Sequence, residues 1–347
     1  MPALSPRPSP SRPFPSRPSL TRPSLKLRLG VLLGASALAL TACGGTSSAS
    51  SDSTGPASTV TVEDNNGTQK IATPPASVVA TDNRTFQTLS DWGVELSAGA
   101  VALMPDTIAY SRDSSIVDLG NHREPNLESV VAANPDLIVN GQRFAQYHED
   151  FERLTPEATI LELDPRDGQP LDAELKRQTT VLGEVFGKQA EAKQLNADFD
   201  AAIDRARKAY DANDKVMAVI TSGGDIGYSA PGNGRTLGPV FDILGLTPAL
   251  EVEDSSEDHQ GDDISVEAIA KSNPDWILAM DRDAAISAAD DAAYRPAHEI
   301  LAGSAALKNV PAVKNQHIVY MPADTYTNEG IQTYTEFFNA FADALEG

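Results

Sequence analysis

The chain has 347 residues, which allows one large domain or two of moderate size. Hydrophobic residues make up 41% of it, enough for a buried core. The first 42 positions hold six basic residues and no acidic ones. The remainder carries 21 basic and 49 acidic residues, a net charge of −28. So acidic a body argues against nucleic acid as a partner.

The N-terminus is predicted to be an export signal, at residues 1–42. Basic residues precede a short apolar run from about Leu29 to Leu40, which is too short to span a membrane. The letters LTAC, which end in Cys43, resemble a bacterial lipobox, and this resemblance implies cleavage before Cys43 and lipid on its sulfur. The alternative is an ordinary secretory signal with a chance cysteine. Cys43 is the single cysteine of the chain, so it cannot form an internal disulfide.

Residues 43–60 are predicted to be a flexible tether. They are rich in Gly, Ser and Thr and show no apolar period. No later stretch is apolar for long enough to span a bilayer. We therefore expect the mature protein to be held at the extracytoplasmic face of the cell membrane by the lipid on Cys43.

Strands and helices are predicted to alternate through residues 61–168. The segment TVTVEDNNGTQKIA alternates in polarity and turns at Asn66-Gly67, which predicts a hairpin. A strand (ASVVAT) and a helix (RTFQTLSDWG) follow. Next, Asn126 is expected to cap a helix over residues 127–133, which precedes the strands DLIVNG and ATILELD. This alternation indicates βαβ units and a mostly parallel sheet.

Residues 171–187 and 188–211 are predicted to be helical, and the α/β pattern then restarts. KVMAVITS and HIVYMPA read as strands, GPVFDILGL reads as a helix, and a final helix is expected from about Asn328. The fold class is thus α/β, with two lobes that each have a mostly parallel sheet flanked by helices. We place the N-terminal lobe at 61–168, the interlobe helix at 169–187 and the C-terminal lobe at 188–347.

One pattern occurs twice, 139 residues apart. It reads NLESVVAANPDLIV at 126–139 and SVEAIAKSNPDWIL at 265–278. The same offset relates Glu128 to Glu267 and Arg143 to Arg282. The glutamates sit near helix starts, where the dipole favours an exposed anion, and the arginines follow strands at the end where ligands of open α/β sheets bind. We expect two similar lobes facing a cleft; the alternative is that the pattern is only a common helix stop followed by a strand start.

The chain resembles the siderophore-binding lipoproteins of ABC iron importers over about residues 60–347. The resemblance is carried by LGNHREPNLESVVAANPDLIVNGQRF, APGNGRTLGPVFDILGL, DHQGDDISVEAIAKSNPDWILAMDR and YMPADTYTNEG. It implies two lobes joined by a single long, rigid helix, with the catecholate or petrobactin-type branch most similar. It also implies a monomeric protein that is not an enzyme, has no resident cofactor, and delivers a ferric siderophore to the membrane subunits of an ABC permease.

In the catecholate branch of that family, three arginines converge on the ferric tris-catecholate. By position these would be Arg143, Arg235 and Arg282. Three catecholates on Fe³⁺ carry a net charge of about −3, and arginine stays charged and offers a planar fork of donors. Arg235 lies in a glycine-rich loop, GNGRTLG. Because its glycines have no side chains, the Arg235 side chain is expected to dominate the surface of this loop. The alternative for each arginine is a surface ion pair.

The resemblance implies further roles for four residues. His259 and Tyr326 would complete the iron shell if the siderophore supplied only four oxygens; imidazole and phenolate both suit Fe³⁺. The alternatives are a solvent-exposed histidine in the acidic loop EDSSEDHQGDD and a packing tyrosine. Glu128 and Glu267 would dock onto arginines of the permease, one per lobe. The alternative is helix-start electrostatics alone.

Three other classes of function fit the sequence less well. The sequence has no G-x-S-x-G, phosphate loop, dinucleotide fingerprint or H-E-x-x-H motif, which argues against an enzyme. The same fold could bind a hydroxamate siderophore, haem or cobalamin, although a neutral hydroxamate chelate would not need three arginines. A structural or adhesive surface protein would leave the paired glutamates without a role.

Overall fold

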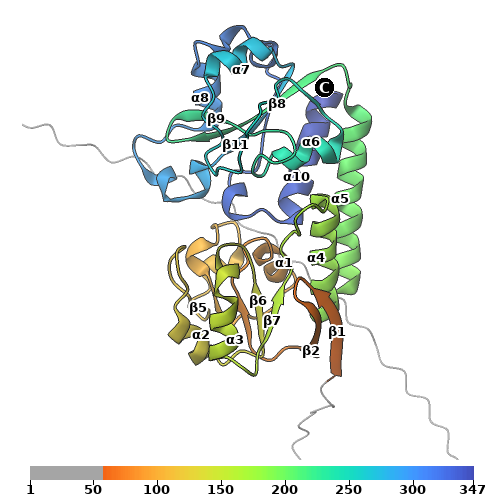
Figure 1. Ribbon diagram of the computed structural model, residues 1–347, viewed down its shortest axis with the longest axis vertical. Coiled ribbons are helices and arrows are strands. Elements are labelled where there is room, and N and C mark those ends of the chain that lie inside the picture. Colours follow the sequence, from red (N-terminus) through yellow and green to blue (C-terminus); the bar gives the residue numbers. More distant parts are fainter. Residues whose placement is uncertain (1–57) are drawn as a thin grey trace, which may run out of the picture. The chain divides into compact units, whose positions relative to one another are not determined.

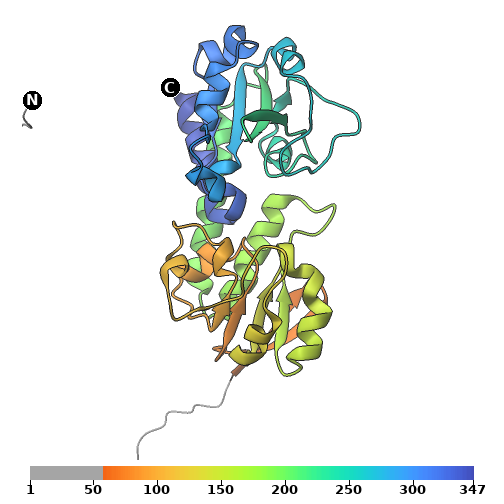
Figure 2. The same cartoon turned by 90° about the vertical axis from the view of Figure 1, so that its left-hand side faces the viewer.

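The structure is a computed structural model that describes residues 58–347 (Figure 1). The predicted signal peptide, Cys43 and most of the tether lie outside the described residues. Residues 58–347 form two α/β lobes, one in the N-terminal and one in the C-terminal half (Figure 2). The predicted fold class is therefore confirmed.

The N-terminal lobe is built on a five-stranded parallel sheet of order β5-β4-β3-β6-β7. Its strands are β3 (Val78–Ala80), β4 (Ala98–Gly99), β5 (Val117–Asp118), β6 (Leu137–Asn140) and β7 (Thr159–Glu162). Its helices are α1 (Phe86–Asp91), α2 (Leu127–Ala133) and α3 (His148–Leu154). The predicted hairpin is also confirmed, as β1 (Ser58–Asp64) paired antiparallel with β2 (Gly67–Thr73).

The C-terminal lobe has a second sheet, of order β10-β8-β11-β12, with β9 antiparallel to β8. Its strands are β8 (Lys215–Ser222), β9 (Asp225–Tyr228), β10 (Thr247–Pro248), β11 (Trp276–Asp281) and β12 (Ile318–Tyr320). Its helices are α6 (Gly238–Leu244), α7 (Val266–Ser272), α8 (Ala297–Gly303), α9 (Pro311–Lys314) and α10 (Ile331–Glu346). The final helix thus begins three residues after the expected Asn328. Residues 325–327 form a 3₁₀ turn instead, and residues 328–330 lie against the N-terminal lobe, a contact that we call the seam between the lobes.

The central strands are apolar on both faces because helices cover both. In β8, Val216, Ala218 and Ile220 pack into one hydrophobic cluster, and Met217 and Val219 pack into another on the opposite face. Alternate side chains of a strand point to opposite faces, so a strand that is buried twice reads as a continuous apolar run. The run KVMAVITS follows this rule, and β8 has the bounds that the sequence predicts.

Two successive helices bridge the cores of the lobes. α4 (Leu171–Val185) and α5 (Gln189–Ala209) cross closely at Gly183, where an added Cβ would lie 2.6 Å from the Ala192 Cβ. Ala192 packs in the N-terminal core and Phe199 in the C-terminal core. At 21 residues, α5 is about 30 Å long. A long helix that runs beside both lobes is thus present as α5 (Figure 1), directly after residues 169–187, where the sequence analysis placed the interlobe helix and where the structure has α4.

The duplicated sequence pattern forms the same local structure in each lobe. α2 is capped by the Asn126 side chain and α7 by Ser265, and each cap accepts a hydrogen bond from the backbone N–H three residues on. Both helices end at an asparagine in the left-handed region, Asn134 (φ 45°) and Asn273 (φ 56°). The Asn-Pro-Asp triplet is thus a helix stop built identically twice.

The aspartates of these triplets fasten the neighbouring strand. Asp136 accepts a hydrogen bond from the backbone N–H of Ser77, just before β3, at 2.9 Å. Asp275 accepts one from the backbone N–H of Lys215, the first residue of β8, also at 2.9 Å. In each lobe, the aspartate therefore aligns the start of its own strand with the start of the neighbouring parallel strand, β6 with β3 and β11 with β8. This alignment also fixes the position of the carboxyl ends of these strands.

Among residues 58–347, none of the helices combines the length and apolarity that crossing a bilayer requires.

Candidate ligand-binding site

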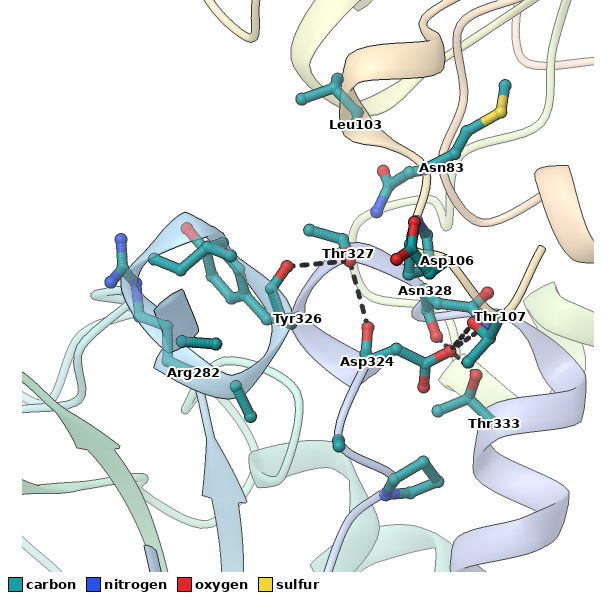
Figure 3. Close-up of a pocket in the computed structure, with 18 of the residues that line it drawn as sticks. Asn83, Leu103, Asp106, Thr107, Arg282, Asp324, Tyr326, Thr327, Asn328 and Thr333 are labelled. Atoms are coloured by element: carbon teal, nitrogen blue, oxygen red, sulfur yellow. Dashed lines mark hydrogen bonds between the residues drawn. The ribbon is translucent and has the colours of Figure 1, made fainter. Parts of the chain in front are cut away.

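A cavity of about 1260 Å³ lies between the lobes (Figure 3). Its wall includes Asn83, Gln87, Leu103, Met104 and Arg143 of the N-terminal lobe and Arg235, His259, Arg282, Ile286, Tyr326 and Asn328 of the C-terminal lobe. Asn83 follows β3, Arg143 follows β6 and Arg282 follows β11. Because ligands of open α/β sheets bind at the carboxyl ends of strands, this cavity is the candidate site.

The three arginines singled out in the sequence all line this cavity, around the ring of Tyr326. Their Cζ atoms lie 5.9 Å (Arg143), 5.1 Å (Arg235) and 4.8 Å (Arg282) from the ring centre. A cation over an aromatic face is attracted by the ring quadrupole. The phenol oxygen also accepts a hydrogen bond from Arg143 Nη2 at 3.2 Å. Tyr326, which is 5% exposed, thus gathers cations from both lobes at one point.

Arg143 is placed by the turn that follows β6. Gly141 lies against the buried Asp82, so that an added Cβ would be 2.8 Å from the Asp82 Cγ. Gln142 has a φ of 55°, and its backbone N–H donates to the Asp164 carboxylate at 2.9 Å. The backbone before Arg143 is therefore held at two consecutive residues, while the Arg143 side chain is exposed.

Arg235 lies in the glycine-rich loop, and close packing explains the glycine before it. A Cβ at Gly234 would overlap the backbone of Ala230. The next residue, Thr236, has a φ of 62°, which is unusual for a β-branched residue. Its hydroxyl donates to Glu329, and Arg235 Nη2 lies 3.6 Å from Glu329 Oε2. One buried carboxylate therefore holds both Arg235 and its neighbour.

Arg282 follows β11 and is held by polar groups of its own lobe. Its Nη1 donates to Asp283 Oδ1 at 3.0 Å and to Ser222 Oγ at 3.2 Å. The Nε atoms of Arg282 and Arg235 are buried, and neither has a hydrogen-bond acceptor among the residues that the structure describes. Buried donors in proteins normally have acceptors, so within residues 58–347 these two nitrogens are unpaired donors in residues that line the cavity.

Beneath the arginines lies a buried charged cluster that the sequence analysis missed. Arg84 Nη1 lies 3.5 Å from Asp164 Oδ1, and Arg84 Nη2 lies 3.4 Å from Glu329 Oε2. Burial, together with the nearby Asp164 carboxylate, raises the pKa of Asp82 to about 7. Burial also raises the pKa of Asp164. The sequence does contain a signal for this cluster, the polar run TDNR at residues 81–84. It lies at the end of a predicted strand, and Arg143 and Arg282 likewise follow predicted strands.

Carboxylates line the other part of the cavity. Asp106, Asp290 and Glu336 are exposed there, and Asp324 is half-buried. Asp324 Oδ2 accepts a hydrogen bond from Thr107 Oγ1 of the other lobe at 2.5 Å. Figure 3 shows Arg282 beside the Tyr326 ring on one side and Asp106, Thr107 and Asp324 on the other. The cavity is therefore positive around Tyr326 and negative towards its opposite rim.

His259 and Tyr326 both line the cavity, as an iron-binding pair would have to. The His259 side chain is 46% exposed, and its nearest carboxylate is that of Asp258, 3.9 Å away. Within residues 58–347, no acidic residue of the loop around His259 lines the cavity, and no three His, Cys, Asp or Glu side chains gather as a metal site. Direct coordination of iron by His259 and Tyr326 stays a prediction.

Glu128 and Glu267 occupy equivalent places in the two lobes. Each is the second residue of its helix, α2 or α7, and each is exposed. Both lie in the first turn, where the helix dipole favours a negative charge. Neither lines the cavity within the described part of the chain. A role in contacting a partner remains a prediction.

The sequence of this chain matches known binding proteins along most of its length. Residues 78–325 match a family model described as periplasmic binding protein. The petrobactin-binding protein YclQ of Bacillus subtilis is 27% identical over 319 residues, covering 90% of this chain and 96% of that protein. The ferric-anguibactin-binding protein FatB of Vibrio anguillarum is 28% identical over 272 residues, covering 77% and 81%.

Solved structures share the fold. The crystal structure of YclQ superimposes with a TM-score of 0.71 at 24% identity, covering 84% of this chain and 99% of that one. The catecholate-siderophore binding protein VctP of Vibrio cholerae gives a TM-score of 0.71 at 23% identity, covering 83% and 100%. The family match runs from β3 to the 3₁₀ turn that carries Tyr326 and so includes both sheets. The chain belongs to the periplasmic binding protein family and is a binding protein rather than an enzyme.

Proposed function

We propose that this chain captures a ferric siderophore, of the catecholate type, in the cavity between its lobes and passes it unchanged to an ABC permease for iron uptake. The observation that carries the proposal is the convergence of Arg143, Arg235 and Arg282 on Tyr326 in one cavity. Three permanent cations at one point suit a compact, multiply charged anion. The relatives YclQ and FatB are named for binding petrobactin and ferric anguibactin, and VctP, which has the same fold, is named a catecholate-siderophore binding protein.

Charge is the reason for preferring a catecholate over other iron chelates. A ferric tris-catecholate carries a net charge of about −3 and exposes fixed acceptor oxygens that match arginine donors. A ferric trihydroxamate is neutral and gains little from three arginines. The second candidate is nevertheless a different iron chelate or cofactor in the same cavity, namely a hydroxamate siderophore, haem or cobalamin. One solved structure with this fold, FhuD of Vibrio cholerae, holds Fe³⁺-Desferal.

The iron itself is cargo, and two protein side chains are candidates to reach it. We propose that His259 and Tyr326 bind Fe³⁺ only when the siderophore supplies four oxygens, because imidazole and phenolate suit this metal. With a hexadentate chelate, the arginines alone would hold the complex. No resident cofactor is part of the proposal.

Delivery requires a surface of the binding protein that the permease recognises. We propose that Glu128 and Glu267 form it, one from each lobe, by pairing with basic residues of the permease. The matched position of the two glutamates at exposed helix starts supports this. We further propose that the protein acts as a monomer anchored by lipid on Cys43, after removal of residues 1–42, at the extracytoplasmic face of the cell membrane.

A ligand screen tests the proposal. Trp92 and Trp276 provide intrinsic fluorescence for titration with a hexadentate ferric catecholate, ferric desferrioxamine, haem and cobalamin. We expect quenching that saturates at micromolar or lower ferric catecholate and none with the other three. A response to ferric desferrioxamine alone would transfer the proposal to the hydroxamate class.

A further inference from the structure

A single buried carboxylate links the ligand-facing arginines to the seam between the lobes. Glu329 is 2% exposed and lies between the 3₁₀ turn that carries Tyr326 and helix α10. One of its oxygens, Oε2, lies 3.6 Å from Arg235 Nη2 and 3.4 Å from Arg84 Nη2. The other, Oε1, accepts the hydroxyl hydrogen of Thr236. Both carboxylate oxygens are therefore used: Arg235 and Thr236 belong to one loop of the C-terminal lobe, and Arg84 belongs to the N-terminal lobe.

The backbone around Glu329 is held against the N-terminal lobe. A Cβ at Gly330 would lie 2.8 Å from the Arg84 carbonyl oxygen, so only glycine allows this approach. Asn328 Nδ2 donates to Gln87 Oε1 at 2.9 Å, and Gln332 Nε2 donates to Thr88 Oγ1 at 3.0 Å. These contacts leave the Glu329 carboxylate little freedom to move independently of the seam.

The loop that carries Arg235 depends on this carboxylate. Thr236 has a left-handed backbone (φ 62°), which costs a β-branched residue free energy that its surroundings must offset. Its hydroxyl bonds Glu329, and its carbonyl oxygen accepts a hydrogen bond from Tyr334 Oη at 2.9 Å. Without the carboxylate, the Arg235 guanidinium would lose its ion pair, and Thr236 would keep only the hydrogen bond between its carbonyl oxygen and Tyr334 of α10.

We propose that Glu329 is a positioning residue for ligand binding: it holds Arg235 in the pose in which its guanidinium meets an anionic ligand. This inference rests on the proposed function, because it assumes that the arginines bind an anionic chelate. It assigns a binding role to an acidic residue that does not meet the ligand itself.

The sign of the effect distinguishes positioning from simple electrostatics. Replacing Glu329 by glutamine removes a negative charge near the arginines, and Coulomb's law alone predicts tighter binding of an anion. Loss of the anchor predicts the opposite, because Arg235 must then be ordered when the ligand binds. Glu336→Gln is the control for loss of charge alone: Glu336 is exposed, lines the cavity and forms no ion pair within residues 58–347, whereas Glu329 is buried and does not line the cavity in that part of the chain. That control should bind the anion slightly more tightly than wild type.

A double-mutant cycle with Arg235→Ala gives the decisive experiment, with the affinity for a hexadentate ferric catecholate as the measurement. If Glu329 acts through Arg235, Glu329→Gln weakens binding by about tenfold in the wild-type background, within the range of coupling between neighbouring charges. In the Arg235→Ala background it causes no further loss. Equal weakening in both backgrounds would mean a general structural role, and unchanged or tighter binding by Glu329→Gln would mean electrostatics alone; either outcome overturns the inference.

A substitute variant and the binding of the wild-type protein make every outcome of this experiment interpretable. If Glu329→Gln does not fold, as judged by its thermal transition, Glu329→Asp replaces it: it keeps the charge, but one methylene fewer prevents it from reaching all three partners. The same cycle and the same outcomes then apply. Wild-type protein that fails to bind the ferric catecholate would refute the proposed function and this inference with it, whereas normal wild-type binding without coupling would refute this inference only.

Discussion

The guanidinium of Arg282 lies over the ring of Tyr326, with 4.8 Å between its Cζ atom and the ring centre. Arg235 of the same lobe and Arg143 of the other lobe lie within 6 Å of the same ring. Three like charges repel one another, and an aromatic face offsets part of that repulsion. Tyr326 therefore serves as a platform that keeps the arginines together, whether or not its oxygen ever binds iron.

Replacing Tyr326 by phenylalanine and by leucine separates these roles. Phenylalanine keeps the aromatic face and loses one hydrogen bond, so ferric catecholate binding should weaken by only about 0.5–1.5 kcal/mol. Leucine loses the face as well and should cost roughly 1–2 kcal/mol more. Affinity is measured by fluorescence titration, and the visible charge-transfer band of the bound chelate by absorption. A band that shifts in Tyr326→Phe with a tetradentate chelate would instead identify the phenolate as an iron ligand.

Truncating single arginines should reduce affinity according to burial. Arg282 is 17% exposed, so Arg282→Ala should cost about 2–5 kcal/mol of binding free energy, the range for a desolvated charge pair. Arg143 is exposed, and its truncation should cost less because water screens it. Arg153→Ala, which removes an exposed arginine outside the cavity, is the control and should bind normally. Equal affinities for all three variants would contradict the assignment of the site.

The buried Asp82 should make the stability of the ligand-free protein depend on pH. Its pKa is raised from 3.8 to about 7 in the fold, so between these values the folded state binds more protons than the unfolded state. The contribution of Asp82 to stability is therefore full below about pH 4 and is lost as the pH rises through about 7. Asp82→Asn cannot ionise, and its stability relative to wild type should increase from pH 5 to pH 8.

Urea unfolding at several pH values measures this difference. Asp198→Asn, at an exposed position of α5, provides the control, and its stability should track the wild type at every pH. If Asp82→Asn also stays parallel to the wild type, Asp82 does not carry the raised pKa.

Permease docking predicts a separation of binding from uptake. Glu128→Ala combined with Glu267→Ala should leave ferric catecholate affinity intact, since neither residue lines the cavity in the described part of the chain. Uptake of labelled iron by cells should fall to the level of cells that lack the protein. The pair Glu149→Ala and Glu299→Ala is the matched control, because these glutamates are exposed, lie in first helical turns and come from one lobe each. Normal uptake with the first pair would end the docking proposal.

Much of the architecture could be predicted because local patterns decide it. KVMAVITS is an uninterrupted apolar run, and Asn126 and the Asn-Pro-Asp triplets mark helix ends through their own side chains and backbone preferences. The short strands β4 and β10 have two residues each, and no period can be read from two residues. Tertiary pairing alone defines them.

Part of the candidate site could also be predicted from local sequence patterns. Arg143 and Arg282 are 139 residues apart, as the two repeats are, and each follows the strand of its repeat, so topology brings them to one cleft. Glu329 could not be found in this way, because its importance comes from burial beside Arg84, which lies 245 positions away in the sequence. Asp82 does lie in the polar run TDNR, but its burial depends on tertiary packing that this run does not predict.

The central claim is that the three arginines form one anion site, and a crystal structure with a bound hexadentate ferric catecholate tests it most directly. We expect the chelate in the cavity between the lobes, with its metal-bound oxygens within hydrogen-bonding distance of Arg143, Arg235 and Arg282. A chelate bound elsewhere, or bound in the cavity without contact to these guanidinium groups, would contradict the account.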